Sequence, residues 1–485
     1  MMRIEILNEP ELEFGGGQRH VDPRFGISAH GPADLGLESA PTSIRLGLVG
    51  PRDQLDGLRR WIERCRQPIA AKGEKYPHLF PAFPGCDSDA GLYTSRSFTD
   101  RDCREVADRA LQHASGLPGE LAVKAMVDAY MGELEAIAEN NRVDVIIVAR
   151  PDTLDDVHLA AEAAENQAEA TATGSGKGKG AAPPVIANFH DLLKARALRL
   201  GKPLQILRRS TWDESAPPPP RRNRQDEATR AWNLHVALYY KASGVPWRLR
   251  RASTDLPTCY VGVSFYRAAD AETLDTAVAH IFNERGDGVI VRGGTAHVRR
   301  DDRQPHLLAA DANNLLRNAL GVYKREHRTL PARVVVHKSS PFTADEIAGF
   351  TTAADDRELH ALDLIWITNS EDAMIFRPGD APPLRGTFMT LGLTEHMIYT
   401  KGSVDFYSTY PGMYVPRPVG LRPARLTISP RELAVEILAL SKMNWNQSRL
   451  DGRFPITLRT AEQVKQILRF CDPEEEIATR YAQYM

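Results

Sequence analysis

Short, almost wholly apolar segments that alternate with helical stretches constrain the fold of this chain more than any other feature. Four such segments are predicted strands, at 43–50, 143–150, 184–190 and 203–209. Stretches with helical periodicity lie beside them, at 54–65, 120–139, 191–200 and 226–243. Strands that are apolar along their whole length are typical of a parallel sheet covered by helices on both faces. The first part of the chain therefore predicts an α/β unit with a parallel sheet.

A second α/β pattern starts near Thr258. The predicted strands lie at 259–267, 288–294, 332–339 and 362–368, and the predicted helices at 308–322, 343–353, 430–443 and 460–470. Strands that come early and helices that come late are typical of several α/β arrangements, among them the ribonuclease H type.

Three segments fall outside these two patterns. Residues 1–42 lack sustained periodicity and contain three consecutive glycines, so we expect an extension that lies on the body or on a partner. Residues 170–182 are rich in Gly, Ala and Lys, and residues 216–224 are rich in Pro and Arg. Both are predicted to be mobile surface loops.

Charge is distributed unevenly along the chain. The 485 residues carry 61 Lys and Arg against 63 Asp and Glu, a net charge of −2. Residues 190–251 alone carry a local excess of positive charge, which indicates an anionic ligand for that region. The five cysteines form no CxxC pair, no apolar run is long enough to span a membrane, and the N-terminus is too acidic for a signal peptide. These features predict a cytoplasmic protein with reduced thiols.

Two nucleotide-binding patterns are suggested by the sequence, and each lacks a part that the pattern requires. The segment GSGKGKG has no strand before it, and Gly178 stands where a Walker loop needs Ser or Thr. A Rossmann-like nucleotide enzyme is suggested by the pattern over 43–209, but that unit has no GxGxxG after its strands.

Four polar residues in the basic region form a candidate anion site: His190, Lys194, Gln205 and Lys241. His190 is expected at the end of a strand and Lys194 one helical turn later, so both face the start of the same helix. Helix N-terminal N–H groups and converging lysines bind anions. Spacing alone leaves open the alternative of four surface residues with no shared role.

The second unit has the strand and helix pattern of a nuclease but lacks the carboxylates that such a nuclease needs. Ribonuclease H-type chemistry uses carboxylates that hold two divalent ions. Ser264 stands at the mid-strand place of the first carboxylate, Ser339 at the place of the second, and Asn444 or Asn446 at the place that a late helix should supply. Serine and asparagine are poor Mg²⁺ ligands beside carboxylate.

An active nuclease with unusual ligands remains the alternative. Its candidate carboxylates, Asp345, Glu346 and Asp363, lie away from the expected places. Each is predicted to belong to a helix or loop surface.

Three stretches carry a resemblance to a known family: YVGVSFYR, RVVVHKSSPF and SKMNWNQSRLDGRFPITLRTAEQV. The chain resembles a short prokaryotic Argonaute over roughly residues 43–485. The resemblance implies an N-terminal extension at 1–42, a Rossmann-like MID domain at 43–252 and a ribonuclease H-like PIWI domain at 253–485.

In this family the four candidate anion-binding residues match the pocket for the guide 5′-phosphate. The resemblance implies that His190 contacts the first nucleotide and that Lys194, Gln205 and Lys241 grip the phosphate. It also implies a Mg²⁺ ion bound through the phosphate, Gln205 and the C-terminal carboxylate, which belongs to Met485. Because the insertion at 216–224 lies between Gln205 and Lys241, the assignment of Lys241 to this pocket is the least secure of the four.

The resemblance further implies a catalytically inactive PIWI domain, consistent with Ser264, Ser339 and Asn446. Such proteins pair as heterodimers with an APAZ-containing effector protein, fused to a sirtuin-like (SIR2) or a TIR NADase. The implied function is prokaryotic immunity: a guide RNA, a single-stranded DNA target, and NAD⁺ depletion by the partner.

Aromatic side chains lie close to the basic residues of the first unit. They are Trp232, Tyr239, Tyr240 and Trp247. Aromatics beside positive charge are typical of single-stranded nucleic-acid binding, where bases stack on them. Core packing explains the same helical spacing equally well.

Overall fold

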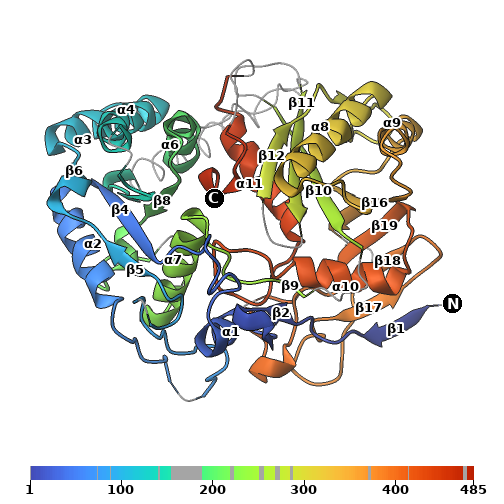
Figure 1. Ribbon diagram of the computed structural model, residues 1–485, viewed down its shortest axis with the longest axis horizontal. Helices are drawn as coiled ribbons and strands as arrows, with labels where there is room; N and C mark the ends of the chain where they lie inside the picture. The colour runs from blue at the N-terminus through green and yellow to red at the C-terminus, as the bar shows by residue number, and fades with distance from the viewer. Residues whose placement is uncertain are drawn as a thin grey trace, which may run out of the picture.

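The structure is a computed structural model of the chain. It describes residues 2–73, 75–87, 89–139, 142–154, 188–218, 223–250, 256–267, 274–283, 288–369, 373–412, 414–472 and 478–485. The insertion expected at 170–182 and most of the strand expected at 184–190 lie outside these residues, as do 219–222 of the second insertion. Two α/β lobes lie side by side, with the C-terminus between them (Figure 1).

The first lobe is built on a parallel sheet. Its strands are β4 (Ser43–Gly50), β5 (Ser95–Ser97), β6 (Cys103–Glu105), β7 (Val145–Ala149) and β8 (Leu204–Leu207). They are ordered β5-β4-β7-β8, and β6 also pairs with β4. All these pairings are parallel, as the apolar strands predicted.

Helices cover both faces of this sheet. One face carries α2 (Arg52–Arg64) and α7 (Glu227–Lys241), and the other carries α3 (Asp108–Ser115), α4 (Gly119–Ala138) and α6 (Phe189–Ala197). Alternate residues of one strand enter the two cores: Leu48 packs with α2 and α7, and Val49 packs with α4. Burial on both faces explains why these strands are continuously apolar.

The second lobe is built on a nine-stranded sheet of order β1-β17-β18-β19-β16-β15-β10-β11-β12. Its strands are β1 (Arg3–Ile6), β10 (Thr258–Arg267), β11 (Leu274–Asn283), β12 (Gly288–Arg292), β15 (Arg333–Lys338), β16 (Ala361–Asn369), β17 (Thr387–Thr390), β18 (His396–Ile398) and β19 (Val419–Arg425). Strands β10, β15 and β16 are parallel, and β11 and β12 continue antiparallel from β10.

Helices again cover this second sheet. They are α8 (Ala309–His327), α9 (Ala344–Asp355), α10 (Pro430–Leu440) and α11 (Ile456–Leu468). Residues of α8 and α9 share a core with Val261 and Val263, whereas α11 packs on the opposite face of β10. At that face a side chain on Gly262 would lie 2.3 Å from the carbonyl oxygen of Thr457, so only glycine allows α11 to approach so closely.

The N-terminal residues fold against the rest of the chain. Strand β1 pairs with β17 at the edge of the large sheet, and β2 (Leu12–Glu13) lies between β3 (Arg19–His20) and β9 (Arg248–Leu249). Helix α1 (Pro23–His30) follows and is capped by Asp22. The apolar side chains of Leu12, Phe14 and Ile27 are fully buried in the main core. The expected extension is therefore an ordered part of the body, and these side chains are not available to a partner.

Candidate functional site

The first candidate residues lie at the start of α6. Asn188 caps this helix by accepting a hydrogen bond from the backbone N–H of Asp191 (2.9 Å), so helical geometry begins at Phe189. His190 therefore lies within the first turn of a helix and does not end a strand, which corrects the prediction. Lys194 follows one turn later on the same helix, as predicted.

Lys194 points into the body of the protein and is only 2% exposed. Its ammonium group donates to the terminal residue Met485, to the carbonyl oxygen of Tyr484 (3.3 Å) and to that of Leu204 (3.5 Å). Burial lowers the pKa of Lys194 to about 7, and the attraction of Asp191 opposes this shift. The end of the chain thus returns to α6 across almost 300 positions of sequence.

Lys241 lies at the C-terminal end of α7 and is also 2% exposed. Its ammonium group donates to the side-chain oxygen of Gln205 in β8 (2.7 Å). Burial lowers the pKa of Lys241 well below its ordinary value, and repulsion from Lys194 lowers it further. The insertion at 216–224 does not prevent Lys241 from reaching Gln205.

His190 lies at the outer side of this group, with about half of its side chain exposed. Its Nδ1 is 2.8 Å from a carboxylate oxygen of Asp191. Both Lys194 and Lys241 lie within electrostatic range of the ring. The structure therefore brings all four predicted residues and Met485 together in one place.

This arrangement favours binding of an anion. Two buried ammonium groups repel each other. Lys194 contacts the terminal residue Met485, whereas the partner of Lys241 among the described residues is the neutral amide oxygen of Gln205. Buried charges are costly unless they are paired, so an added anion would stabilise Lys241 above all. A side-chain amide oxygen and a terminal carboxylate are also the oxygen ligands that Mg²⁺ accepts.

Of the two serines at the predicted carboxylate places, Ser264 lies in β10 and Ser339 directly follows the end of β15. Val263 of β10 pairs with Lys338 of β15 in parallel register, and Ser264 and Ser339 each come one residue later. Ser264 is fully buried, and its hydroxyl has no hydrogen-bond partner among the described residues. A hydroxyl at this place cannot supply the charge of a carboxylate to a metal ion.

The proposed third ligand position differs from the prediction. Asn444 and Asn446 lie in turns after α10 rather than on a helix. Their neighbours belong to the first lobe: Trp445 packs on Tyr240 at a ring distance of 4.6 Å, and Ser448 donates to Asn233. This stretch holds the two lobes together.

Two of the three alternative carboxylates are buried, which corrects their assignment to the surface. Glu346 accepts from Lys338 (2.5 Å) and from the backbone N–H of Leu307 (2.9 Å). Asp363 pairs with Arg333 (2.6 Å). Asp345 alone is exposed. The two buried carboxylates are thus neutralised by cations of the protein, as expected for structural ion pairs.

Lys338 was not recognised from the sequence, although it immediately precedes Ser339. It is fully buried, and its ammonium group lies over the rings of Phe265 (5.5 Å) and Phe342 (5.1 Å). Burial lowers its pKa to about 8, against the attraction of Glu346. Nothing in the sequence around this lysine indicates that its side chain is buried.

The aromatic residues of the first lobe belong to the core. Trp232, Tyr239, Tyr240 and Trp247 are all buried. The indole N–H of Trp232 donates to the carbonyl oxygen of Ala82 (3.0 Å), and the hydroxyl of Tyr239 to Asp34 (2.7 Å). Core packing, one of the two readings that the sequence left open, is the one observed.

Two kinds of feature are absent from the described part of the chain. It contains no cluster of three or more His, Cys, Asp or Glu residues that could hold a metal ion. None of its helices combines the length and apolar character that a membrane span requires.

Comparison with known proteins identifies the fold. No protein-family model matches the sequence, and no curated protein matches it. Among solved structures, the chain is similar to Clostridium butyricum Argonaute bound to a guide DNA and a 19-mer target DNA (TM-score 0.66, 13% identity, 99% of this chain and 54% of that one). It is also similar to Aa-Ago with externally bound siRNA (0.57, 13%, 98% and 55%) and to Drosophila Piwi (0.58, 13%, 99% and 56%).

The chain thus spans about half of the length of these structures while almost all of it is matched. The parallel sheet of the first lobe and the mixed sheet of the second correspond to the two α/β units predicted from the sequence. The chain therefore has an Argonaute-like fold, in which a Rossmann-like MID domain is followed by a ribonuclease H-like PIWI domain.

Proposed function

We propose that this protein binds a guide RNA through its 5′-phosphate and uses it to detect a single-stranded DNA target. The observation that carries the proposal is the pair of buried lysines, Lys194 and Lys241, held within electrostatic range of each other. A phosphate placed between them would supply the negative charge that Gln205 cannot. His190, exposed at the rim, would contact the first nucleotide.

Magnesium fits this pocket as a partner of the phosphate. Gln205 and the terminal carboxylate of Met485 would hold the ion, and phosphate oxygens and water would complete its oxygen shell. The ion would neutralise part of the phosphate charge. The lysines would then hold the remaining charge and exclude water from it.

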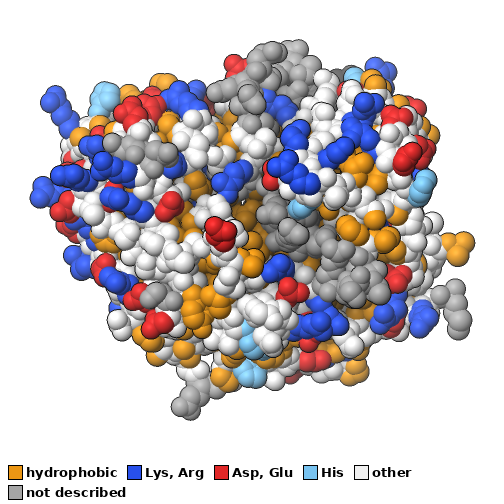
Figure 2. Space-filling view, viewed as in Figure 1, with side chains coloured by type: hydrophobic (Ala, Val, Ile, Leu, Met, Phe, Trp, Pro, Cys, Tyr) orange, Lys and Arg blue, Asp and Glu red, His pale blue; other side chains and the backbone are white. Residues whose placement is uncertain are grey.

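The wider surface supports binding of a strand. Lys and Arg side chains stand on both sides of a central hollow between the lobes (Figure 2). Two solved Argonautes with this fold are described as bound to nucleic acid, one of them with guide and target DNA and the other with siRNA. Positive charge along such a channel supplies affinity for phosphates whatever the base sequence.

We further propose that the PIWI domain binds the target without cutting it, because Ser264 and Ser339 replace two carboxylates. The output would then come from a partner. An APAZ-containing effector with a sirtuin-like NADase, or second a TIR NADase, would deplete NAD⁺ when the target pairs with the guide. Target binding would act as a ligand that favours the active arrangement of the heterodimer.

The pocket is tested by replacing Lys194 and Gln205 together with alanine. Charge-assisted hydrogen bonds are worth about 1.5–3 kcal/mol each, so affinity for a 5′-phosphorylated guide RNA should fall at least about tenfold. A 5′-hydroxyl guide should bind both proteins almost equally, and the exposed Lys124→Ala variant should bind like the wild type. Equal losses for both guides would exclude this pocket as the phosphate site.

A further inference from the structure

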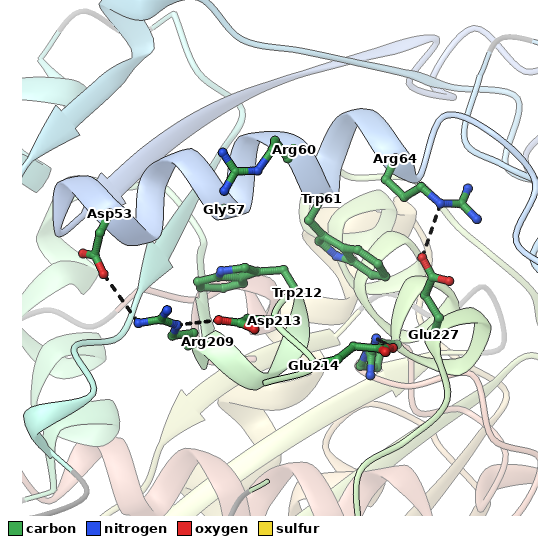
Figure 3. A pocket seen from close by; sticks show the side chains of 11 residues that line it. Asp53, Gly57, Arg60, Trp61, Arg64, Arg209, Trp212, Asp213, Glu214 and Glu227 are labelled. Atoms are coloured by element: carbon green, nitrogen blue, oxygen red, sulfur yellow. Dashed lines mark hydrogen bonds and ion pairs between the residues drawn. The ribbon is translucent and has the colours of Figure 1, made fainter. Parts of the chain in front are cut away.

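A second polar cavity lies in the MID domain, apart from the proposed guide pocket. It has a volume of about 530 Å³ and lies between α2, the segment after β8 and the start of α7 (Figure 3). Helix α2 directly follows β4, and Arg209 and Trp212 follow β8. The cavity is therefore at the carboxyl edge of the parallel sheet, where open α/β sheets generally bind ligands.

The cavity and the guide pocket lie at opposite ends of α7. Arg230 near the start of this helix lines the cavity, and Lys241 is its last residue. Eleven residues of helix separate them by about 16 Å. A ligand in one site therefore does not occupy the other.

Two tryptophans line the cavity, Trp61 from α2 and Trp212 from the segment after β8 (Figure 3). Trp212 lies flat against α2 at Gly57, where a Cβ would come within 2.6 Å of the indole nitrogen. Trp61 lies under the guanidinium of Arg230, 5.6 Å from its ring centre. Paired aromatic surfaces of this kind stack on flat heterocycles.

Two buried donors beside the cavity have no acceptor among the described residues. They are the indole Nε1 of Trp61 and the Nε of Arg230, and both side chains are more than nine-tenths buried. Buried donors without acceptors are uncommon in folded proteins. Both atoms are closed to solvent in this structure, so a ligand with carbonyl or ring-nitrogen acceptors would satisfy them when Trp61 and Arg230 turn toward the cavity.

The charges of the cavity limit the charge of its ligand. Arg209 is saturated by Asp53, Asp152 and Asp213, at 3.5, 3.3 and 2.8 Å. Arg64 pairs with Glu227 (3.4 Å), and Arg230 pairs with Glu214 (3.2 Å). Only Arg60, which is exposed, has no carboxylate partner among the described residues that line the cavity. The lining holds four arginines and four carboxylates and has no net charge, so a polyphosphate would be repelled and only Arg60 is free to contact one phosphate group.

We propose that this cavity binds a single nucleotide: a base stacked against Trp212 and the Trp61–Arg230 pair, with one phosphate on Arg60. The nucleotide is either a free nucleoside monophosphate or one residue of a nucleic-acid strand. This site is additional to the guide pocket, and it does not depend on the proposed guide function.

The test is equilibrium dialysis of the full chain against radiolabelled guanosine 5′-monophosphate and against guanosine. Trp212→Leu should weaken binding of both probes at least about tenfold, since stacking on an aromatic side chain commonly contributes that much. Arg60→Gln should weaken the monophosphate and leave guanosine unchanged. The matched control is Trp366→Leu, because Trp366 also lies beside a cavity under an arginine, Arg422 at 4.8 Å, but in the other lobe.

The two sources of the nucleotide, and the two sites, are separated by a Lys194→Ala, Lys241→Ala background. In that background, a site for free nucleotides still binds the monophosphate. A site for one residue of a strand binds only a short 5′-phosphorylated RNA. In both cases, changing Trp212 or Arg60 should weaken binding as it does in the wild-type background. The proposal is overturned if neither the two probes nor the short RNA binds at millimolar concentration, if Trp366→Leu weakens binding as much as Trp212→Leu, or if the background alone abolishes all binding.

Discussion

At the scale of single residues, the deeply buried lysines differ in the partners that compensate their charge. Lys338 and Lys442 are fully buried, and each pairs with a carboxylate, Glu346 at 2.5 Å and Glu9 at 3.0 Å. Lys241 is almost as deeply buried, and its hydrogen-bond partner among the described residues is the amide oxygen of Gln205. The first two lysines are explained by their ion pairs. Lys241 is best explained by a ligand that brings the missing charge.

Replacing Lys241 with methionine should therefore stabilise the guide-free protein. The pKa of this lysine is lower in the folded than in the unfolded chain. The unfolded chain thus binds a proton that the folded chain resists, which destabilises the fold below the ordinary lysine pKa of about 10.4. At pH 7 the Tm should rise by about 2 °C or more, and the gain should shrink as the pH approaches 10.

Thermal melts at pH 6, 7, 9 and 10 check this prediction. The exposed Lys124→Met variant is the control, and its Tm should stay close to that of the wild type. A lower Tm for Lys241→Met at pH 7 would show that Lys241 supports the fold and is not held there for a ligand.

The sequence could indicate only part of this pocket. Helical spacing is local, so the proximity of His190 and Lys194 followed from four positions of sequence. The contact of Lys241 with Gln205 bridges an irregular insertion, and that of Lys194 with Met485 depends on how the two lobes dock. No local pattern encodes either contact.

At the scale of elements, one carboxylate of the N-terminal segment forms ion pairs with two buried cations of the body. Glu9 bonds Arg385 (2.8 Å) and Lys442 (3.0 Å), whose side chains are fully buried. Burial alone would raise the pKa of Glu9, but these two cations overcome the effect and lower it. Glu9, in the segment between β1 and β2, therefore neutralises buried positive charge in the PIWI core.

Replacing Glu9 with glutamine should destabilise the whole chain by about 3 kcal/mol, because it leaves two buried cations without their counter-charge. The carboxylate stabilises the fold above its ordinary pKa range. Its contribution should be lost as the pH falls through its lowered folded value, so the difference between Glu9→Gln and the wild type should shrink in acid.

Urea unfolding at pH 7 and pH 4 measures this difference. Glu11→Gln is the matched control, because Glu11 pairs with Arg250 at 3.2 Å while both side chains are almost half exposed, and such pairs contribute little. If the two variants lose equal stability at pH 7, the N-terminal segment is not integral to the core.

Elements were predictable from sequence where burial is continuous. Strands β4, β7, β15 and β16 are buried along most of their length, and their apolar runs identified them. The edge strand β1 has four mostly exposed residues, and its place is set by pairing with a strand almost 400 positions away. A short strand stabilised by a distant partner leaves no periodic signal.

At the scale of the whole molecule, the N-terminal segment connects the two lobes. Arg24 of α1 donates to the carbonyl oxygen of Leu79 in the first lobe (2.9 Å) and to the hydroxyl of Tyr407 in the second (3.1 Å). What remains exposed at the start of the chain is the apolar side of β1, with Ile4 and Ile6 about half exposed or more. A free sheet edge with exposed apolar side chains can accept a strand from another protein.

We expect the proposed partner to bind at this edge. Co-expression with an APAZ-containing effector encoded beside this protein should yield a stable heterodimer. Changing Ile4 and Ile6 to glutamate should weaken it, because charges would be buried at the interface, while Leu121→Glu on the exposed side of α4 should not. Separate elution of the two wild-type proteins at micromolar concentration, or NAD⁺ loss that is equal with and without guide and target, would contradict the sensor mechanism.

The most direct test of the account is the fate of a target held by the loaded protein. The protein is incubated with a 5′-phosphorylated guide RNA, a matched single-stranded DNA labelled at both ends, and Mg²⁺ or Mn²⁺. We expect the DNA to be retained only when it matches the guide and to be recovered at full length, because serine hydroxyls such as those of Ser264 and Ser339 are poor ligands for catalytic metal ions. A single cut at a fixed distance from the guide 5′ end, lost when a PIWI carboxylate is replaced, would contradict it.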